Sequence, residues 1–353
     1  MSVSFHHALV LRNAVTKSAF GRLCRVAGLV LAVGLITNAQ GLAQDGQTPA
    51  AVPSDAPATA ASPEGIGSPA IAEPSPPSGD AAYGAYQRGL FLTAFLRATD
   101  RLERDPGDVA AMTLLGELHA QGLGIPQDFG KAAEWYRLAA RRGDANAAFA
   151  LGSLVLEGRG VERDPGVARR HFEEAAEQGH APASYNLALM LLNDDAPDAI
   201  ERAARLLERA AEAEIPDAQH ALGVLYAHGR GVQEDDARAA ALYRRAAENG
   251  SLAGAVEYAI ARFNGIGVAR DEEEAAEYFR RAAYRGNAIA QNRLARLYVA
   301  GRGVEVDLVE AAAWHLLASS QGLTDTWLDD ALNELPEEDE AEAERRALER
   351  MDA

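Results

Sequence analysis

The sequence predicts an all-helical solenoid, a chain of short helix pairs stacked one on the next, and three observations lead to this fold class. Hydrophobic residues make up 48% of the 353 residues, but aromatic residues only 6%. Alanine, which is abundant, has the highest helix propensity, whereas strands favour β-branched and aromatic residues. One sequence pattern recurs every 36 residues, and glycines at fixed positions divide each copy into two helical stretches. A period of this length is typical of helical repeat proteins.

The first 43 residues have the sequence pattern of an export signal. Basic residues between positions 17 and 25 precede an apolar run of eleven residues, 26–36, and small residues follow it. These are the parts of a secretory signal peptide, and the run is shorter than the ~20 apolar residues of a membrane span. We expect cleavage after Ala43, with Ala39 as the alternative, and no stable membrane insertion afterwards. The expected location is periplasmic, with secretion as second choice; an uncleaved anchor is the other interpretation.

The composition of residues 44–82 predicts a disordered linker. The segment consists mainly of Pro, Ala, Ser and Gly, and it contains eight prolines, from Pro49 to Pro77. Such a composition buries too little apolar surface to offset the entropy lost on ordering, and its prolines favour extended backbone. We therefore expect the folded part of the chain to begin near residue 83.

Six copies of the repeated pattern follow, five of 36 residues and one of 35. They span 108–143, 144–179, 180–214, 215–250, 251–286 and 287–322. Residues 83–107 resemble a shortened first helix pair, and residues 323–353 predict capping helices rich in Glu and Arg. Because each repeat of a solenoid contacts only its neighbours, its two ends need such caps.

Each copy begins with a helix, and in every copy except the third this helix ends near a pair of glycines. In the fourth copy, Ala218, Leu222 and Leu225 have the i, i+4, i+7 spacing of one helix face. Gly229 and Gly231 follow, and then Val232. A glycine just past a helix can adopt the left-handed conformation, and an apolar residue after it packs back on the last turn. We interpret the glycine pair as the helix stop and expect Gly231 in the left-handed region.

In every copy except the third, the second helix begins at an aspartate, three residues after the Val or Ile that follows the glycines. Aspartate is a strong N-cap. The pairs Asp271/Glu274 and Asp307/Glu310 have the spacing of capping boxes, in which the glutamate side chain returns to the N–H of the cap residue. Aromatic residues and alanines occupy the inward face, and a glycine ends the helix.

The combined pattern, Ala-x-x-x-Leu-Gly-x-x-Tyr-x-x-Gly-x-Gly-Val-x-x-Asp followed by Ala-x-x-Trp/Tyr-Tyr/Phe-x-x-Ala-Ala-x-x-Gly, resembles the Sel1-like repeat. The resemblance covers residues 108–322. It implies a right-handed α-solenoid, a superhelix of antiparallel helix pairs related to tetratricopeptide repeats. A narrower likeness involves 85–89, the third copy without its glycines, 311–314 and 322–325. These segments look like periplasmic regulators of exopolysaccharide synthesis, a group that restrains a membrane sensor kinase through the periplasmic part of that kinase.

The sequence gives no sign of catalytic, cofactor-binding or metal-binding residues, and we expect a non-enzymatic protein. Neither Lys17 nor Lys131 has a serine three residues earlier, as a Ser-x-x-Lys hydrolase needs. Cys24 is the single cysteine and precedes the apolar run. Histidines occur at six different repeat positions, whereas a repeated metal site would use one. The net charge of −18 argues against nucleic acid as the main partner.

One stripe of residues on the first helices is a candidate partner-binding groove. The sixth, tenth and thirteenth positions of each copy lie within a narrow arc of the helix, and they are mainly apolar in the middle repeats. The candidate residues are Phe149, Tyr185, Leu189, His220, Val256, Ile260 and Phe263. An apolar groove could take a peptide or helix of a partner. The alternative is that the stripe packs against the second helix of a neighbouring repeat.

These observations predict a periplasmic adaptor or regulator that binds a protein, and the partner we expect is the periplasmic part of a membrane sensor kinase controlling exopolysaccharide or envelope functions. A scaffold for an envelope, motility or polysaccharide-export complex is one alternative. A secreted peptidoglycan or β-lactam hydrolase is the other.

Overall fold

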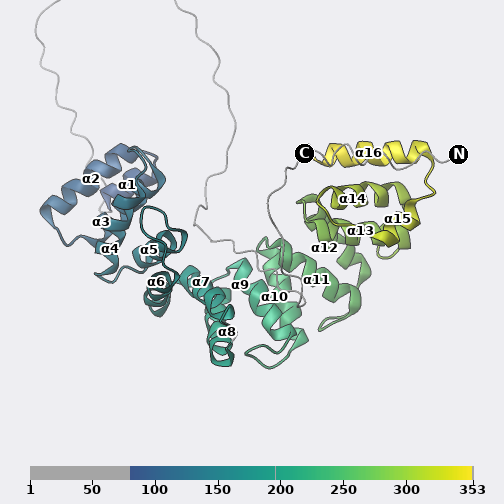
Figure 1. The fold of residues 1–353 in the computed structure, drawn as a ribbon, viewed down its shortest axis with the longest axis horizontal. Helices are drawn as coiled ribbons and strands as arrows, with labels where there is room; N and C mark the ends of the chain where they lie inside the picture. Colours follow the sequence, from purple (N-terminus) through teal and green to yellow (C-terminus); the bar gives the residue numbers. More distant parts are fainter. Residues whose placement is uncertain (1–79, 195, 352–353) are drawn as a thin grey trace, which may run out of the picture. The chain divides into compact units, whose positions relative to one another are not determined.

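The computed structural model describes residues 80–194 and 196–351, and in this part of the chain every regular element is a helix (Figure 1). The chain divides into two compact units, residues 80–165 and 166–351. The expected signal peptide and all but the last three residues of the expected linker lie outside the described residues. The first helix begins at Ala81, within the last residues of that linker.

The first unit contains α1 to α5, with the bounds Ala81–Gln87, Phe91–Arg104, Val109–Gln121, Phe129–Ala140 and Ala145–Glu157. The second unit contains α6, which starts at the boundary, and α7 to α16. Their bounds are Pro165–Glu177, Ala181–Leu192, Pro197–Glu212, Pro216–Ala227, Asp236–Glu248, Leu252–Asn264, Glu272–Tyr284, Ala288–Ala300, Leu308–Ser320, Thr326–Leu332 and Glu337–Met351. Consecutive helices pack in pairs, as expected for an α-solenoid.

Aspartates begin the second helices, as the sequence predicts. The side chains of Asp128, Asp235, Asp271 and Asp307 each accept a hydrogen bond from the backbone N–H three residues later. The expected capping boxes are wrong. The N–H of Asp271 bonds instead to the carbonyl of Arg262, and the Glu274 carboxylate pairs with the Arg262 guanidinium. The N–H of Asp307 likewise bonds to the carbonyl of Tyr298, so the preceding first helix takes the place of the glutamate.

The two glycines of each pair have different roles. The first, as at Gly122 and Gly265, is left-handed and ends its helix. The second is also left-handed, but it lies against the start of the second helix of the preceding repeat. A Cβ at Gly267 would come within 2.0 Å of the Asp236 carbonyl oxygen. Gly231 has φ +68° as expected, yet α9 has already ended at Ala227. The interpretation of Gly231 as part of the helix stop is therefore incomplete, because this glycine also permits close contact between repeats.

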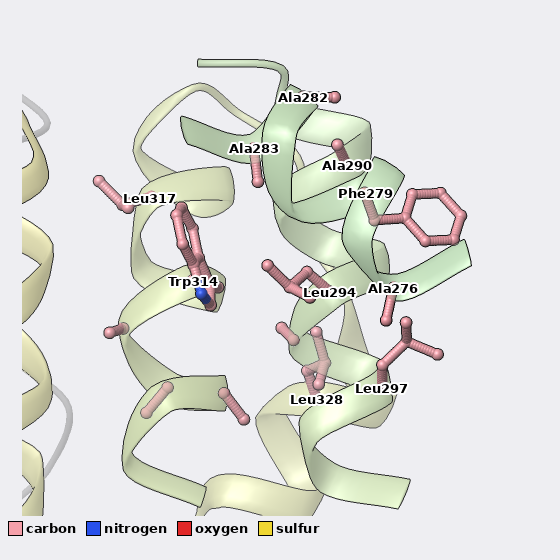
Figure 2. Close-up of a cluster of buried hydrophobic side chains, with 14 of the residues drawn as sticks. Ala276, Phe279, Ala282, Ala283, Ala290, Leu294, Leu297, Trp314, Leu317 and Leu328 are labelled. Carbon is pink, nitrogen blue, oxygen red and sulfur yellow. The ribbon is translucent and has the colours of Figure 1, made fainter. Parts of the chain in front are cut away.

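The core of the last repeats consists of alanines and a few large side chains (Figure 2). Phe279, Leu294 and Trp314 come from three successive helices and are at most 2% exposed. The small alanines let α12, α13 and α14 approach closely, because packing of helices depends on the side chains at the contact. Helix α16 then packs on α14. There Arg350 donates to the Glu310 carboxylate at 2.6 Å. Among the described helices, none has the length and apolarity of a membrane span.

Candidate protein-binding surface

The structure places the seven candidate stripe residues on four different helices, and several of them are buried. Tyr185 and Leu189 on α7 are 2% and 9% exposed, and Val256 on α11 is 5% exposed. A side chain this deeply buried cannot present its surface to a partner. At these three positions the structure favours the alternative interpretation, packing within the solenoid.

The other four stripe residues are half-buried. Phe149 lies on α5 of the first unit, and His220 lies on α9 of the second. Ile260 and Phe263 share α11 with Val256, and both pack against the buried cluster of the last repeats. The guanidinium of Arg302 lies 4.0 Å above the Phe263 ring. Of these four half-buried residues the structure brings together only Ile260 and Phe263, and a binding role for the stripe stays a prediction.

A different set of side chains forms what we call the central strip: Tyr185, Asp217, His220, Tyr243 and Glu257. They come from α7, α9, α10 and α11 of the second unit. The rings of His220 and Tyr243 are 5.9 Å apart and tilted by 39°. Tyr243 can lie close to α9 because Gly223 faces its ring; a Cβ there would be 2.6 Å from Cε1 of the tyrosine. The repeat's own glycine therefore positions an aromatic ring in the strip.

Partial burial shifts the titration of the strip. Burial lowers the pKa of His220, although the nearby Asp217 carboxylate opposes the shift. Burial and the same aspartate raise the pKa of Tyr185 to about 12. Burial also raises the pKa of Tyr243, and the Glu257 charge contributes. These side chains are consequently neutral at pH 7, with donor and acceptor atoms close to a carboxylate.

Glu257 is the most unusual member of the strip. Burial raises its pKa, and the exposed His228 is the group that acts against the shift. No described residue makes a hydrogen bond or salt bridge to its carboxylate. A half-buried carboxylate without a partner is costly, and perturbed titratable groups are concentrated at functional sites. The arrangement can bind a cationic or hydrogen-bond-donating group of another molecule.

Sequence reasoning missed Glu257 and Asp217. Glu257 occupies the seventh position of its repeat, where three copies carry Leu114, Ala150 or Ala221 and the other two carry Asn186 and Arg293. Because this position is polar in half of the copies, the repeat pattern alone does not single out Glu257. In the described part of the chain, no group of three or more His, Cys, Asp and Glu side chains is arranged to hold a metal ion.

Comparison with known proteins identifies the repeats. The family model described as Sel1 repeat matches residues 109–144, 145–180, 181–214, 216–251, 253–287 and 288–323. Each matched segment starts within two residues of the start expected from the sequence pattern. No curated protein matches the chain.

Two solved structures are similar to the chain. A Sel1 repeat protein from Oxalobacter formigenes has 26% identity and a TM-score of 0.58, and the similarity covers 67% of this chain and 94% of that one. The second is c5321, a protective antigen of uropathogenic Escherichia coli with an SLR fold. It has 26% identity and a TM-score of 0.52, and the similarity covers 74% of this chain and 64% of that one.

Proteins with these repeats generally mediate protein–protein interactions. Six consecutive matches span more than half of the sequence. The chain described here therefore belongs to the Sel1 repeat family.

Proposed function

We propose that the protein is a non-enzymatic periplasmic adaptor or regulator that binds a partner protein through the accessible residues of the central strip, Asp217, His220 and Glu257. The observation that carries this proposal is the half-buried Glu257 carboxylate, whose pKa is raised by burial. A partner that places an arginine or lysine against it would supply the missing counter-charge. Charge-assisted hydrogen bonds of this kind are among the stronger polar contacts in proteins.

The chemistry of the strip supports a polypeptide partner. His220 supplies a half-buried ring beside the buried Tyr243 ring, and Asp217 is an exposed carboxylate on the same helix as His220. Aromatic side chains beside charged groups are typical of protein interfaces, where aromatic residues and arginine dominate the binding energy. The net charge of −18 would also steer a basic segment towards the protein.

We propose further that the partner is the periplasmic part of a membrane sensor kinase that controls exopolysaccharide or envelope functions. This step depends on the expected signal peptide, residues 1–43, and on the narrower resemblance of residues 85–89 and 311–325 to regulators of that type.

Site-specific photo-crosslinking in intact cells tests the proposal. A photoreactive phenylalanine replaces Asp217 or Ala253, two exposed residues close to the strip, and Ala253 lies one helical turn before Glu257. The matched control is Ala241, exposed on α10 but about 200° around the helix from Tyr243. We expect the photoreactive residue at the Asp217 and Ala253 positions, but not at the Ala241 position, to crosslink to a membrane signalling protein.

Two other outcomes would contradict parts of this proposal. Crosslinks from the strip to subunits of a structural envelope complex would favour the scaffold alternative. Equal crosslinking from all three positions would show that the strip is not the binding surface. N-terminal sequencing of the same protein should find Gln44 at the mature end, and an intact Met1 would exclude the expected cleavage.

A further inference from the structure

The first unit contains an apolar cavity between three helices that the proposed function does not use. Its volume is about 300 Å³, within the range of small ligand sites. Phe95, Thr99 and Leu102 of α2 form one wall, Leu115 and His119 of α3 the second, and Trp135 of α4 the third.

His119 is the polar group at this cavity. Its side chain belongs to a residue that is only 9% exposed, and its Nδ1 atom has no hydrogen-bond partner in the described structure. The Phe95 ring lies edge-on at 6.0 Å. Burial lowers the pKa of His119, and the Lys131 charge adds to the shift. The imidazole is therefore neutral near pH 7, and a buried polar atom of this kind normally has a partner.

The same place in later repeats is occupied by aromatic rings. The positions of Leu115 and Trp135 correspond to Tyr258 and Tyr278 in the fifth repeat, whose rings meet edge-to-face at 4.8 Å. In the sixth repeat the residue equivalent to Trp135 is Trp314, which lies beside Leu294 (Figure 2). There the Tyr284 ring, from the preceding second helix, packs edge-on to the indole at 5.0 Å. No described residue places a ring against Trp135 in this way.

An exposed apolar stripe leads to the cavity. Leu92 and Leu96 of α2 are 56% and 58% exposed. Thr99 and Glu103, both at the cavity, continue the same face at i+7 and i+11 from Leu92. A polypeptide lying along this face of α2 would cover the two leucines and place one side chain at the cavity.

We propose that this cavity, which we call the Trp135 pocket, binds a tyrosine side chain of a partner protein. The ring lies edge-on to Trp135, as Tyr284 does to Trp314, and the hydroxyl bonds to Nδ1 of His119. A phenolic hydroxyl both donates and accepts, so it matches either tautomer of the imidazole, whereas an indole N–H only donates. Residues 44–79 contain no aromatic residue, so that segment of this chain does not supply the ring.

Binding of 4-methylphenol, the tyrosine side-chain analogue, tests the proposal on the full chain, with toluene as the matched probe that lacks the hydroxyl. We expect ligand-observed NMR titrations to show 4-methylphenol binding about three- to tenfold more tightly, the usual effect of one hydrogen bond. Leu102→Trp should fill the cavity and abolish binding of both probes. Leu138→Trp adds the same ring at an exposed position of α4 outside the cavity and should leave binding unchanged.

His119→Phe provides the second variant, and it keeps the test decisive if Leu102→Trp fails to fold. It should retain toluene binding and remove the preference for 4-methylphenol. Absence of binding by the wild type, or equal affinity for the two probes, would overturn the tyrosine assignment; equal affinity would indicate an apolar occupant such as phenylalanine. Binding that persists in a folded Leu102→Trp variant would place the probes elsewhere. The titration does not involve the central strip, so its failure leaves the crosslinking test of the proposed function intact.

Discussion

Gly116 on α3 lies directly against the ring of Tyr136 on α4: a Cβ at Gly116 would come within 2.5 Å of Cε1 of the tyrosine. The ring is held in place, because the Tyr136 hydroxyl donates a 2.8 Å hydrogen bond to the carboxylate of Glu117. The glycine of the first helix and the tyrosine of the second are thus one packing unit. In the fifth repeat the pair is Ala259 and Phe279, so the first helix carries a Cβ where the facing ring has no hydroxyl.

Gly116→Ala is therefore expected to destabilise the first unit, although alanine is the better helix former. Overpacking of a tight contact typically costs about 1–3 kcal/mol, which exceeds the ~1 kcal/mol gained in helix propensity. Urea unfolding measures the change. In the double variant with Tyr136→Phe, the ring can move and the cost of Gly116→Ala should be smaller. An additive double-mutant cycle would show that the hydroxyl does not anchor the ring.

The second glycine of each pair should be more sensitive than the glycine that ends a repeat. Gly231 and Gly250 are both left-handed, but a Cβ at Gly231 would be 2.8 Å from the backbone of Ile200, whereas nothing lies within 4 Å of one at Gly250. Strain alone costs about 1–3 kcal/mol for each alanine variant. Gly231→Ala should lose more free energy of unfolding than Gly250→Ala. Equal losses would show that contact between repeats does not depend on this glycine.

The local elements of the fold could be predicted from the sequence, because their causes are local. An aspartate such as Asp235 caps a helix through its own side chain, and the same kind of cap recurs with the 36-residue period. The partners of Gly267 and of the Asp271 N–H could not be predicted. Both lie on another helix, and the approach of two helices is decided by packing rather than by spacing along one segment.

For the candidate site too, local features could be predicted from the sequence, whereas contacts between helices could not. The pattern placed Tyr185 and Val256 correctly on first helices, but periodicity does not say whether a face meets solvent or another helix. Packing of neighbouring helices decides this, and both residues are buried. Glu257 does not stand out in the sequence, because Asn186 and Arg293 occupy the same repeat position, and its missing counter-charge became visible once its neighbours were known.

Tyr185→Glu is consequently expected to destabilise the second unit. The side chain is 2% exposed, and loss of a buried aromatic residue costs about 3–5 kcal/mol, with a further cost for an unpaired buried charge. Circular dichroism during thermal unfolding should show a clear drop in melting temperature. Arg205→Glu introduces the same residue at an exposed position of α8 and should change stability by less than about 1 kcal/mol. An unchanged melting temperature for Tyr185→Glu would return this position to the candidate groove.

Asp325 should stabilise the C-terminal end in a pH-dependent way. Burial alone would raise its pKa, but hydrogen bonds from Arg296, Asn292 and the Leu328 N–H lower it to about 2. A lowered pKa in the folded state adds stability above the unfolded value of 3.8, and this stability is lost as the pH falls towards 2.

We expect Asp325→Asn to reduce the free energy of unfolding by about 1.5–3 kcal/mol at pH 7, the usual worth of a charged hydrogen bond. The difference from the wild type should shrink between pH 4 and pH 2 in urea unfolding experiments. Asp330→Asn, at an exposed position of the same helix, is the control. A difference that does not depend on pH would mean that the Asp325 charge is not the stabilising feature.

Glu257→Gln should make the free protein more stable and its partner complex weaker. Burial raises the pKa of Glu257, so its ionised form disfavours folding. The penalty is absent below the unfolded value of 4.5 and grows as the pH rises through the folded pKa. The variant and the wild type should therefore unfold alike at pH 4, whereas the variant should be the more stable at pH 8. Glu234→Gln, at an exposed position, should show no such trend.

If a basic residue of the partner pairs with Glu257, Glu257→Gln should also weaken binding about ten- to a hundredfold. A gain in stability with unchanged affinity for the crosslinked partner would exclude Glu257 from the interface. The carboxylate would then lower the stability of the free protein without contributing to binding.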